Sequence, residues 1–350
     1  QSQLQSQLQK SIQKLIQMIT LLQKQQLGSK GNKSTMKVLV TGGTGFLGRN
    51  IGKHLPKFLS EHTELLIRSI GSDPYDLRCQ QACRKAIEYY QPDVIVHAAG
   101  SVGGIGANQE NPGKFMYENL VMGANMIERA RLYSDKYKPI KFILLGTVCA
   151  YPKFTPVPFK EEELWNGYPE ETNAPYGIAK KALMKLLSTY HEQYGMNGVN
   201  LIPVNMYGPY DHFNLTSSHV IPALILKFYN AMRDHKREVT LWGTGTVSRE
   251  FLYAPDCCEA IALAIQNDIG PEPINIGSGS EITIGNLATE IAEQMGFEGD
   301  ILYDTSKPDG QPRRCLDVSK AKEKLGFKAK TDLQTGLQRT IEWFLKEQKK

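Results

Sequence analysis

Residues 37–48 read KVLVTGGTGFLG, an apolar run that leads directly into three evenly spaced glycines. A strand followed by such a glycine turn and then by a helix is the start of a dinucleotide-binding unit. The glycines allow a tight turn close to a pyrophosphate, and the helix N-terminus supplies free N–H groups for the phosphates. A glycine turn without a ligand is the alternative, which the flanking strand and helix disfavour. We expect the cofactor to contact Gly42, Thr44, Gly45, Phe46, Leu47 and Gly48.

Beyond this stretch, short apolar runs alternate with segments of helical periodicity. Strands are expected at residues 37–41, 64–68, 94–98, 142–145 and 199–204, and helices at 49–59, 79–90, 115–132 and 178–194. Strands separated by helices predict an α/β fold with a Rossmann-type, doubly wound parallel sheet. After Met206 the order becomes less regular, so we expect a smaller mixed α/β C-terminal lobe there.

Three parts of the chain are expected from these patterns. A cofactor-binding domain would cover residues 36–205 and a substrate-binding lobe residues 206–350, with some crossing of the chain between them. Residues 1–35 differ from both parts, because they are rich in Gln and carry Leu and Ile at heptad spacing. They predict a short amphipathic or coiled-coil helix followed by a polar linker.

Composition and charge exclude several classes of protein. Apolar residues make up 41% and charged residues 22% of the chain, as in an ordinary globular protein. The formal net charge of +5 is spread without a long run of Lys or Arg, so no nucleic-acid partner is expected. No apolar stretch approaches the length of a membrane span, so no membrane partner is expected. The six cysteines fit neither a zinc site nor a disulfide framework, and we expect reduced thiols, no metal and a cytoplasmic location.

The end of the second expected strand indicates which cofactor is bound. A carboxylate at this place binds the ribose 2′-hydroxyl of NAD, whereas an Arg accommodates the 2′-phosphate of NADP. The chain has Arg68 and no acid at this strand end, which favours NADP(H). Asp76 and Leu77 are expected to face the adenine, and Ala98 and Ala99 at the end of the third strand are expected to line the cofactor.

A tyrosine and a lysine, Tyr176 and Lys180, lie four residues apart at the start of a helix and therefore share one face of it. An ammonium beside a phenol favours the phenolate and lowers the pKa of the Tyr, which can then exchange a proton with a carbonyl or alcohol oxygen. Thr147, at the end of the fourth strand, offers a third hydroxyl. An ordinary helix surface is the alternative, but the position after a dinucleotide-binding segment favours a carbonyl-reducing site.

Several separate segments agree with one known family. They are Val102–Ile105, Cys149–Pro152, Tyr176 with Lys180, Asn205–Pro209, Ser218–Pro222, Trp242–Gly245, Arg249–Phe251 and Lys307–Gly310. On these segments the chain from Met36 to Lys346 resembles the extended short-chain dehydrogenase/reductases and, within them, the GDP-L-fucose synthase family. A Cys two residues after Thr147, together with SHVIP at 218–222, is much more specific than the glycine loop.

The resemblance implies an NADPH-dependent enzyme that epimerises C3 and C5 of GDP-4-keto-6-deoxy-D-mannose and then reduces C4, giving GDP-L-fucose. Cys149 and His219 would be the acid/base pair, because the 4-keto group acidifies the neighbouring carbons. Tyr176 would protonate the C4 oxygen with Thr147 hydrogen-bonded to it, while Lys180 tunes Tyr176 and holds the nicotinamide ribose. The residues that would bind the GDP-linked keto-sugar are Asn205, His219, Lys227, Trp242, Arg249 and Lys307. A homodimer built through paired helices is implied as well.

Three departures from the family pattern leave alternatives open. Thr147 stands where Ser is usual, Ser101 replaces a Lys of some members, and Lys227 replaces an Arg and loses its bidentate geometry. A related epimerase/reductase or 4-epimerase for another nucleotide-linked sugar is one alternative, and a cofactor-binding scaffold is another. Taken singly, Cys149 also fits ordinary packing and His219 also fits the capping region of a helix.

Overall fold

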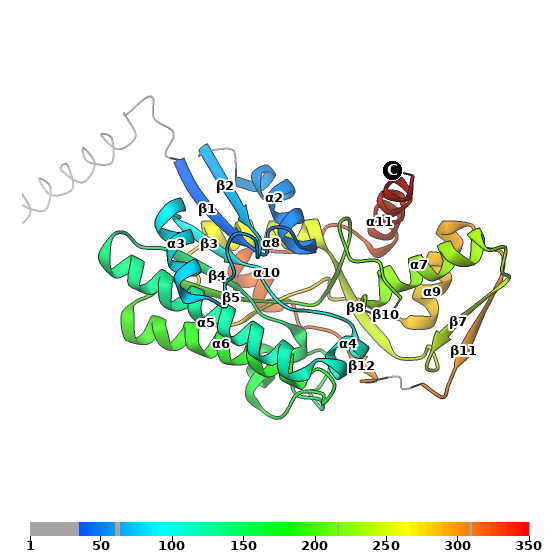
Figure 1. The fold of residues 1–350 in the computed structure, drawn as a ribbon. Coiled ribbons are helices and arrows are strands. Elements are labelled where there is room, and N and C mark those ends of the chain that lie inside the picture. The colour runs from blue at the N-terminus through cyan, green and yellow to red at the C-terminus, as the bar shows by residue number, and fades with distance from the viewer. Residues whose placement is uncertain (1–34, 60–63, 216, 308–309, 350) are drawn as a thin grey trace, which may run out of the picture.

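The computed structural model of the protein describes residues 35–59, 64–215, 217–307 and 310–349. The helix expected at the N-terminus and nearly all of its linker lie outside the described residues. In Figure 1 the described chain forms a layered α/β body and a second lobe of helices and short strands beside it.

Six parallel strands form the main sheet, in the order β2-β1-β3-β4-β5-β9. Their bounds are β1 (Thr35–Thr41), β2 (Glu64–Ile70), β3 (Val94–His97), β4 (Lys141–Leu145), β5 (Gly198–Pro203) and β9 (Ile274–Ile276). The predicted doubly wound sheet is confirmed, because β1 pairs with β2 on one side and β3 on the other, where the winding reverses. In open sheets of this kind, ligands bind outside the carboxyl ends of the strands at such a reversal.

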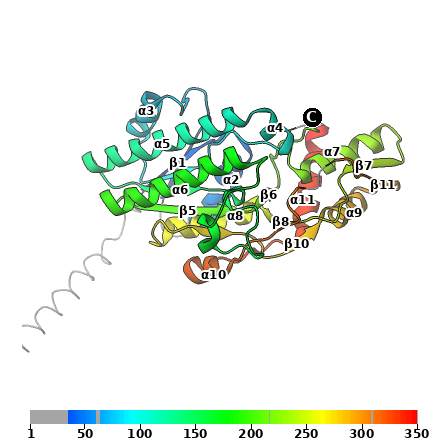
Figure 2. The ribbon, with the colours of Figure 1, turned by 90° about the horizontal axis from the view of Figure 1, so that it is seen from below.

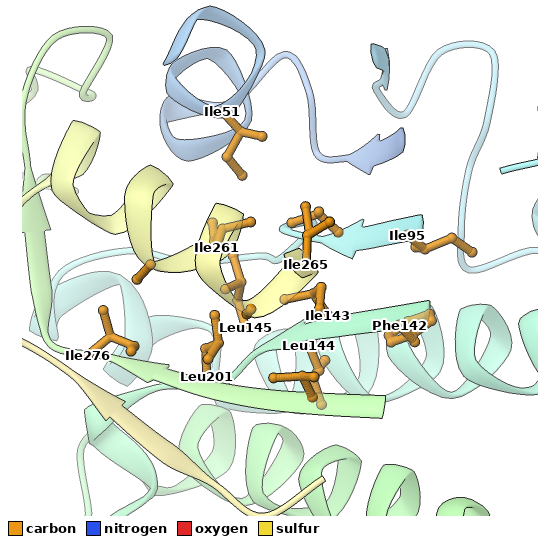
Figure 3. Close-up of a cluster of buried hydrophobic side chains, with 14 of the residues drawn as sticks. Ile51, Ile95, Phe142, Ile143, Leu144, Leu145, Leu201, Ile261, Ile265 and Ile276 are labelled. Carbon is orange, nitrogen blue, oxygen red and sulfur yellow. The ribbon is translucent and has the colours of Figure 1, made fainter. Parts of the chain in front are cut away.

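Helices cover both faces of this sheet, as Figures 1 and 2 show. One face carries α2 (Phe46–Leu59), α8 (Ala254–Gln266) and α10 (Ser319–Leu325), and the other carries α3 (Gln80–Tyr90), α5 (Pro112–Lys136) and α6 (Ala174–Tyr194). Strands enclosed in this way are apolar on both faces, and every residue of β3 and β5 is buried. Figure 3 shows Ile51 of α2 and Ile261 and Ile265 of α8 packed over Ile143 and Leu145 of β4.

The second lobe has its own hydrophobic core, which includes the buried rings of Phe228 and Phe344. Its helices are α7 (Val220–Arg233), α9 (Ile284–Met295) and α11 (Leu333–Gln348), and its strands are β7 (Glu238–Trp242), β8 (Ser248–Tyr253), β10 (Glu281–Thr283) and β11 (Asp300–Asp304). Between the lobes lie β6 (Asn205–Tyr207) and β12 (Arg313–Arg314), which both pair with β8. The short helices α4 (Ile105–Glu110), η1 (Val148–Ala150) and η2 (Glu161–Trp165) complete the fold.

The chain returns from the second lobe to the main sheet. After β8 it forms α8, which packs against α2, and then β9, which pairs in parallel with β5. Strand β9 could not be predicted from the sequence, because three residues between loops are too few to show a periodic pattern. The strand is nevertheless buried, and the side chain of Asn275 in it accepts a hydrogen bond from the Tyr151 hydroxyl at 2.7 Å.

A buried acid of β8 holds the loop after β9 and the segment after β12 against this strand. The Glu250 side chain has no exposed surface, and its carboxylate accepts hydrogen bonds from the backbone N–H groups of Gly279 and Leu316, both at 2.7 Å. Burial raises the pKa of Glu250, while these hydrogen bonds oppose that rise. This anchor holds β12 beside β8 and therefore places the side chains of residues 311–314 next to the sheet edge.

Two further expectations concern the chain as a whole. All six cysteines are unpaired, as their spacing predicted. Among the described residues, no helix combines the length and the apolar character that crossing a membrane requires.

Candidate functional site

A cavity of about 1170 Å³ lies at the carboxyl edge of the main sheet and extends to the second lobe. Its walls come from the loops after β1, β2, β3 and β4, from the starts of α6 and α7, and from β8 and β12. Nineteen of the predicted site residues line it: Gly42, Thr44, Gly45, Phe46, Leu47, Gly48, Asp76, Leu77, Ala98, Ala99, Thr147, Cys149, Tyr176, Lys180, Asn205, His219, Lys227, Trp242 and Arg249. Arg68 and Lys307 do not line it.

The glycine loop forms the end of this cavity at which the cofactor is expected. Gly42 has a φ of 69°, and a Cβ added there would lie 2.8 Å from the backbone N and Cα of Ala99. A Cβ on Gly48 would overlap the carbonyl oxygen of Gly42, so the first turn of α2 passes directly over the loop. The backbone N–H of Gly45 donates to the Gly42 carbonyl at 3.0 Å, which closes the turn. A narrow cradle at a helix N-terminus fits a dinucleotide pyrophosphate.

Arg68 is placed differently from the prediction. Its side chain lies in a small separate depression with Tyr89 and Tyr90, and its Nη1 donates to the Ile67 carbonyl at 3.4 Å. The reason is the length of β2, which continues to Ile70 rather than ending at Arg68. The residues that follow the true end of the strand and line the cavity are Gly71, Ser72, Tyr75, Asp76, Leu77 and Arg78.

An ionic network that the sequence did not indicate lies beside the expected adenine position. Arg78 pairs with Asp76 and with Glu118 of α5, each at 2.8 Å, and Glu118 also accepts a hydrogen bond from the Ser101 hydroxyl. The hydrogen bonds from Arg78 lower the pKa of Asp76. Arg78 adjoins the predicted pair Asp76 and Leu77 in sequence. Glu118 is 40 residues from Arg78, and the sequence around it does not indicate this contact.

The end of β4 and the start of α6 bring three hydroxyl and thiol groups together. Thr147 caps the short helix η1, and its Oγ1 accepts a hydrogen bond from the backbone N–H of Cys149 at 3.2 Å. Tyr176 lies in the first turn of α6. That turn approaches η1 closely because Gly177 has no side chain, and a Cβ there would overlap the carbonyl oxygen of Cys149.

The protonation of Tyr176 differs from the prediction. Its pKa is raised, first by burial and then by the charge of Cys149, while the Thr147 hydroxyl opposes the shift through a hydrogen bond. Lys180 is buried, its pKa falls to about 8 because of that burial, and its Nζ donates to the Leu145 carbonyl at 3.2 Å. The expected lowering of the pKa of Tyr176 by Lys180 is therefore wrong for this structure. Tyr176 is a neutral phenol at neutral pH, the form that donates a proton.

His219 faces the cavity from the N-cap position of α7. His219 therefore does lie in the capping region of a helix, as the alternative interpretation expected, but its side chain makes no capping hydrogen bond and stays available to the cavity. His219 is an exposed residue that opens onto the cavity, and the cavity walls around its imidazole disfavour the charged form through partial desolvation. This desolvation, followed by the charge of His212, lowers the pKa of His219 and favours the neutral imidazole at pH 7.

The predicted substrate residues occupy the part of the cavity formed by the second lobe. Lys227 of α7 donates to the Thr240 carbonyl at 2.8 Å, and Arg249 of β8 donates to the Ser248 carbonyl at 2.7 Å. The Trp242 ring is 65% exposed at the cavity wall. Lys307 lies outside the lining, with its Nζ 5.7 Å from the centre of the Trp242 ring.

A second buried cation was not predicted at all. Arg314 of β12 lines the cavity, and its Nη1 lies 3.6 Å from the Sγ of Cys149. The two residues are 165 positions apart, and a strand of two residues has no periodicity that could have indicated this contact.

Comparison with known proteins agrees with this arrangement. Residues 38–277 match the NAD dependent epimerase/dehydratase family. The chain is 40% identical over 309 residues to a GDP-L-fucose synthase of Sinorhizobium fredii, covering 88% of this chain and 95% of that protein. It is 37% identical to a GDP-L-colitose synthase of Yersinia pseudotuberculosis, over 89% of this chain and 99% of that one. The predicted resemblance to the GDP-L-fucose synthases is confirmed.

A solved structure extends the likeness to the fold and the cofactor. The crystal structure of a GDP-L-fucose synthetase from Naegleria fowleri bound to NADP superimposes with a TM-score of 0.80 at 28% identity. The match covers 91% of this chain and 96% of that one.

The glycine cradle provides a direct test of cofactor binding. In Gly48→Ala the new methyl group would overlap the backbone oxygen of Gly42, which cannot move without opening the loop. We expect NADPH binding, measured by calorimetry, to be lost and the protein to be destabilised by about 1–3 kcal/mol. Gly113→Ala is the matched control, since a Cβ there has no neighbour within 4 Å. Equal NADPH affinity for the Gly48 variant and the wild type would contradict the assignment of this loop.

Proposed function

The chain belongs to the NAD dependent epimerase/dehydratase family, and on that premise we propose that it converts GDP-4-keto-6-deoxy-D-mannose to GDP-L-fucose with NADPH. It is an NADP-dependent enzyme of the oxidoreductase and epimerase class. One observation carries the choice of reaction. Cys149, His219 and the group of Thr147, Tyr176 and Lys180 line the same cavity as the glycine cradle.

The reduction uses the residues at the end of β4 and the start of α6. When bound, NADPH supplies a hydride for C4 of the sugar. Tyr176 donates its phenolic proton to the C4 oxygen, and its raised pKa keeps that proton in place at neutral pH. The Thr147 hydroxyl donates a second hydrogen bond to the same oxygen. Lys180 would hold the nicotinamide ribose, and its positive charge would stabilise the phenolate that forms when Tyr176 gives up its proton.

The epimerisation uses Cys149 and His219, which face the cavity from different lobes. The 4-keto group lets the charge left by proton removal at C3 or C5 spread onto its oxygen, where Thr147 and Tyr176 donate. A thiol and an imidazole have different accessible protonation states, so one removes a proton while the other returns one to the opposite face. Both groups must be close to the ring, which the positions of Cys149 within η1 and of His219 at the start of α7 permit.

The nucleotide part of the substrate would lie against the second lobe. Arg249 and Lys227 supply positive charge for the diphosphate, since charge-assisted hydrogen bonds to phosphate are strong. The exposed ring of Trp242 offers a flat apolar surface for the guanine. Lys307, above that ring, would approach the nucleotide from the loop after β11.

Turnover of the keto-sugar tests the proposal. We expect the wild type to oxidise NADPH with GDP-4-keto-6-deoxymannose and to form GDP-L-fucose, identified by NMR. Cys149→Ala and His219→Ala should each lose about 100-fold or more in solvent-deuterium incorporation at C3 and C5, because each removes one acid/base group. Cys79→Ala, an exposed cysteine outside the cavity, is the control. No NADPH oxidation, or a different sugar product, would refute the proposed reaction.

The pKa of Lys180 predicts how the reduction depends on pH. A lysine whose pKa is about 8 carries its charge below that pH and loses it as the pH rises through 8. The raised pKa of Tyr176 keeps the phenol protonated over the same range. We expect the single-turnover rate of hydride transfer to fall above pH 8, and Lys180→Arg to move that fall upward. A wild-type rate that stays constant up to pH 10 would exclude a role for the ammonium.

A homodimer is the proposed assembly, with α5 and α6 as its interface. These helices lie side by side on the outside of the sheet in Figures 1 and 2. They approach closely at Gly123, where a Cβ would overlap the Leu183 side chain. Their outer surface carries exposed apolar groups, among them Tyr117 (61% exposed) and Leu132.

The mass in solution tests this assembly. Light scattering should give the mass of two chains for the wild type and of one chain for Tyr117→Glu, because a charge placed in an apolar interface is costly. Tyr89→Glu on α3, a position 75% exposed, should leave the mass unchanged. A wild type with the mass of one chain would refute the dimer.

A further inference from the structure

Arg314 lies beside the thiol of Cys149 in the wall of the cavity. Its Nη1 is 3.6 Å from the Cys149 Sγ, within hydrogen-bond distance for sulfur. Only 8% of the Arg314 surface is exposed, so its guanidinium is largely removed from bulk water. The contact joins β12, which follows the second lobe, to η1 at the end of β4.

A neutral amide, rather than a carboxylate, fixes the orientation of this guanidinium. The Gln311 Oε1 accepts hydrogen bonds from Nε and Nη2 of Arg314 at 3.2 and 3.1 Å. Gln311 is held in turn, because its Nε2 donates to the Lys153 carbonyl at 2.8 Å. In the part of the chain that the structure describes, no carboxylate lies within ion-pair distance of Arg314. The neighbouring Arg313 instead points outward and pairs with Glu281.

We propose that Arg314 stabilises the thiolate of Cys149 and thereby sets the pH range in which this residue exchanges protons. Arg314 is in this sense a positioning residue that acts through Cys149. The proposal rests on the proposed function only where it gives Cys149 a part in catalysis, because the thiolate fraction of Cys149 can be measured without any sugar.

The physical reason is charge compensation inside a partly desolvated site. A buried guanidinium without an anionic partner is costly, and an anion at hydrogen-bond distance recovers part of that cost. The sulfur of Cys149 is such an anion once its proton has left. As a base, the thiolate accepts a proton from C3 or C5 and becomes a thiol, leaving an enolate. As an acid, the thiol gives its proton to the carbon and becomes the thiolate, so either role passes through the form that Arg314 favours.

Several other groups share this part of the cavity and bear on the protonation of Cys149. Tyr176 and Lys180 face it from α6, His219 from the start of α7, and Glu170 from the loop before α6, while Arg249 lies on the neighbouring strand β8. Lys180 directs its ammonium to the Leu145 carbonyl. Within the described residues, Arg314 is the only cation that donates a hydrogen bond to the Cys149 sulfur.

Alkylation by iodoacetamide measures the thiolate directly. The rate of modification of the tryptic peptide 142–153, which contains Cys149, is followed by mass spectrometry from pH 5 to 10. The pH midpoint is the readout, because the rate at one pH also depends on intrinsic nucleophilicity. For Arg314→Met we expect a thiolate fraction roughly tenfold lower at any pH below the midpoint, the usual effect of removing one adjacent charge.

Three further variants separate charge from structure. Arg314→Lys keeps the charge and should return the midpoint toward the wild-type value. Gln311→Glu keeps the shape of the amide but gives Arg314 a carboxylate partner, so the midpoint should rise although the guanidinium is still present. Arg313→Met removes the neighbouring charge, which pairs with Glu281, and should leave the midpoint unchanged.

The proposal is overturned if Arg314→Met and Gln311→Glu both keep the wild-type midpoint, or if Arg313→Met shifts it as far as Arg314→Met. With keto-sugar present, the acid limb of deuterium exchange at C3 and C5 should move upward in Arg314→Met. If the wild type does not use the keto-sugar, the proposed function fails, while the alkylation midpoints still decide the role of Arg314.

Discussion

The close approach of two backbone turns, after β1 and after β3, is the constraint on which the site depends. Gly42 and Ala99 are so near that no side chain fits between them. This contact exists because β3 lies directly beside β1 on the side away from β2. The cavity lies at this reversal of the strand order, where the glycine cradle, the hydroxyls after β4 and the second lobe all meet. A different strand order would separate these groups even if every motif were kept.

Within the cavity, burial decides protonation more than sequence neighbours do. Lys180 is near Tyr176 on the same helix, yet burial raises the pKa of the phenol and lowers that of the ammonium. Each shift favours the neutral form of its group, and in the proposed reaction a neutral phenol is the form that donates a proton. The two buried cations donate their hydrogen bonds to different groups. Lys180 donates to a backbone carbonyl, and Arg314 donates to a sulfur.

The features predicted well from the sequence are those that depend on a single continuous segment. The glycine loop, the Tyr176 helix and the strands through β5 were placed within a few residues, because each has its own period or turn signal. Arg68 was misplaced because the last two residues of β2 look no different from a loop. The neighbours Arg314 and Glu118 were missed because strand pairing and helix packing, rather than spacing, bring them to the cavity. The direction of the pKa shift at Tyr176 also depends on burial, which one sequence does not reveal.

The return of the chain to the main sheet affects how this protein can be altered. Strand β9 and helix α8 follow β8, yet they complete the sheet and cover α2. The second lobe is therefore not one continuous segment of the chain, and exchanging everything after Met206 for the same region of another enzyme would also replace an edge strand and part of the core. Altered sugar specificity would have to be introduced as separate loop grafts, with residues 254–276 left untouched. Variation among natural enzymes of this architecture would be under the same restriction.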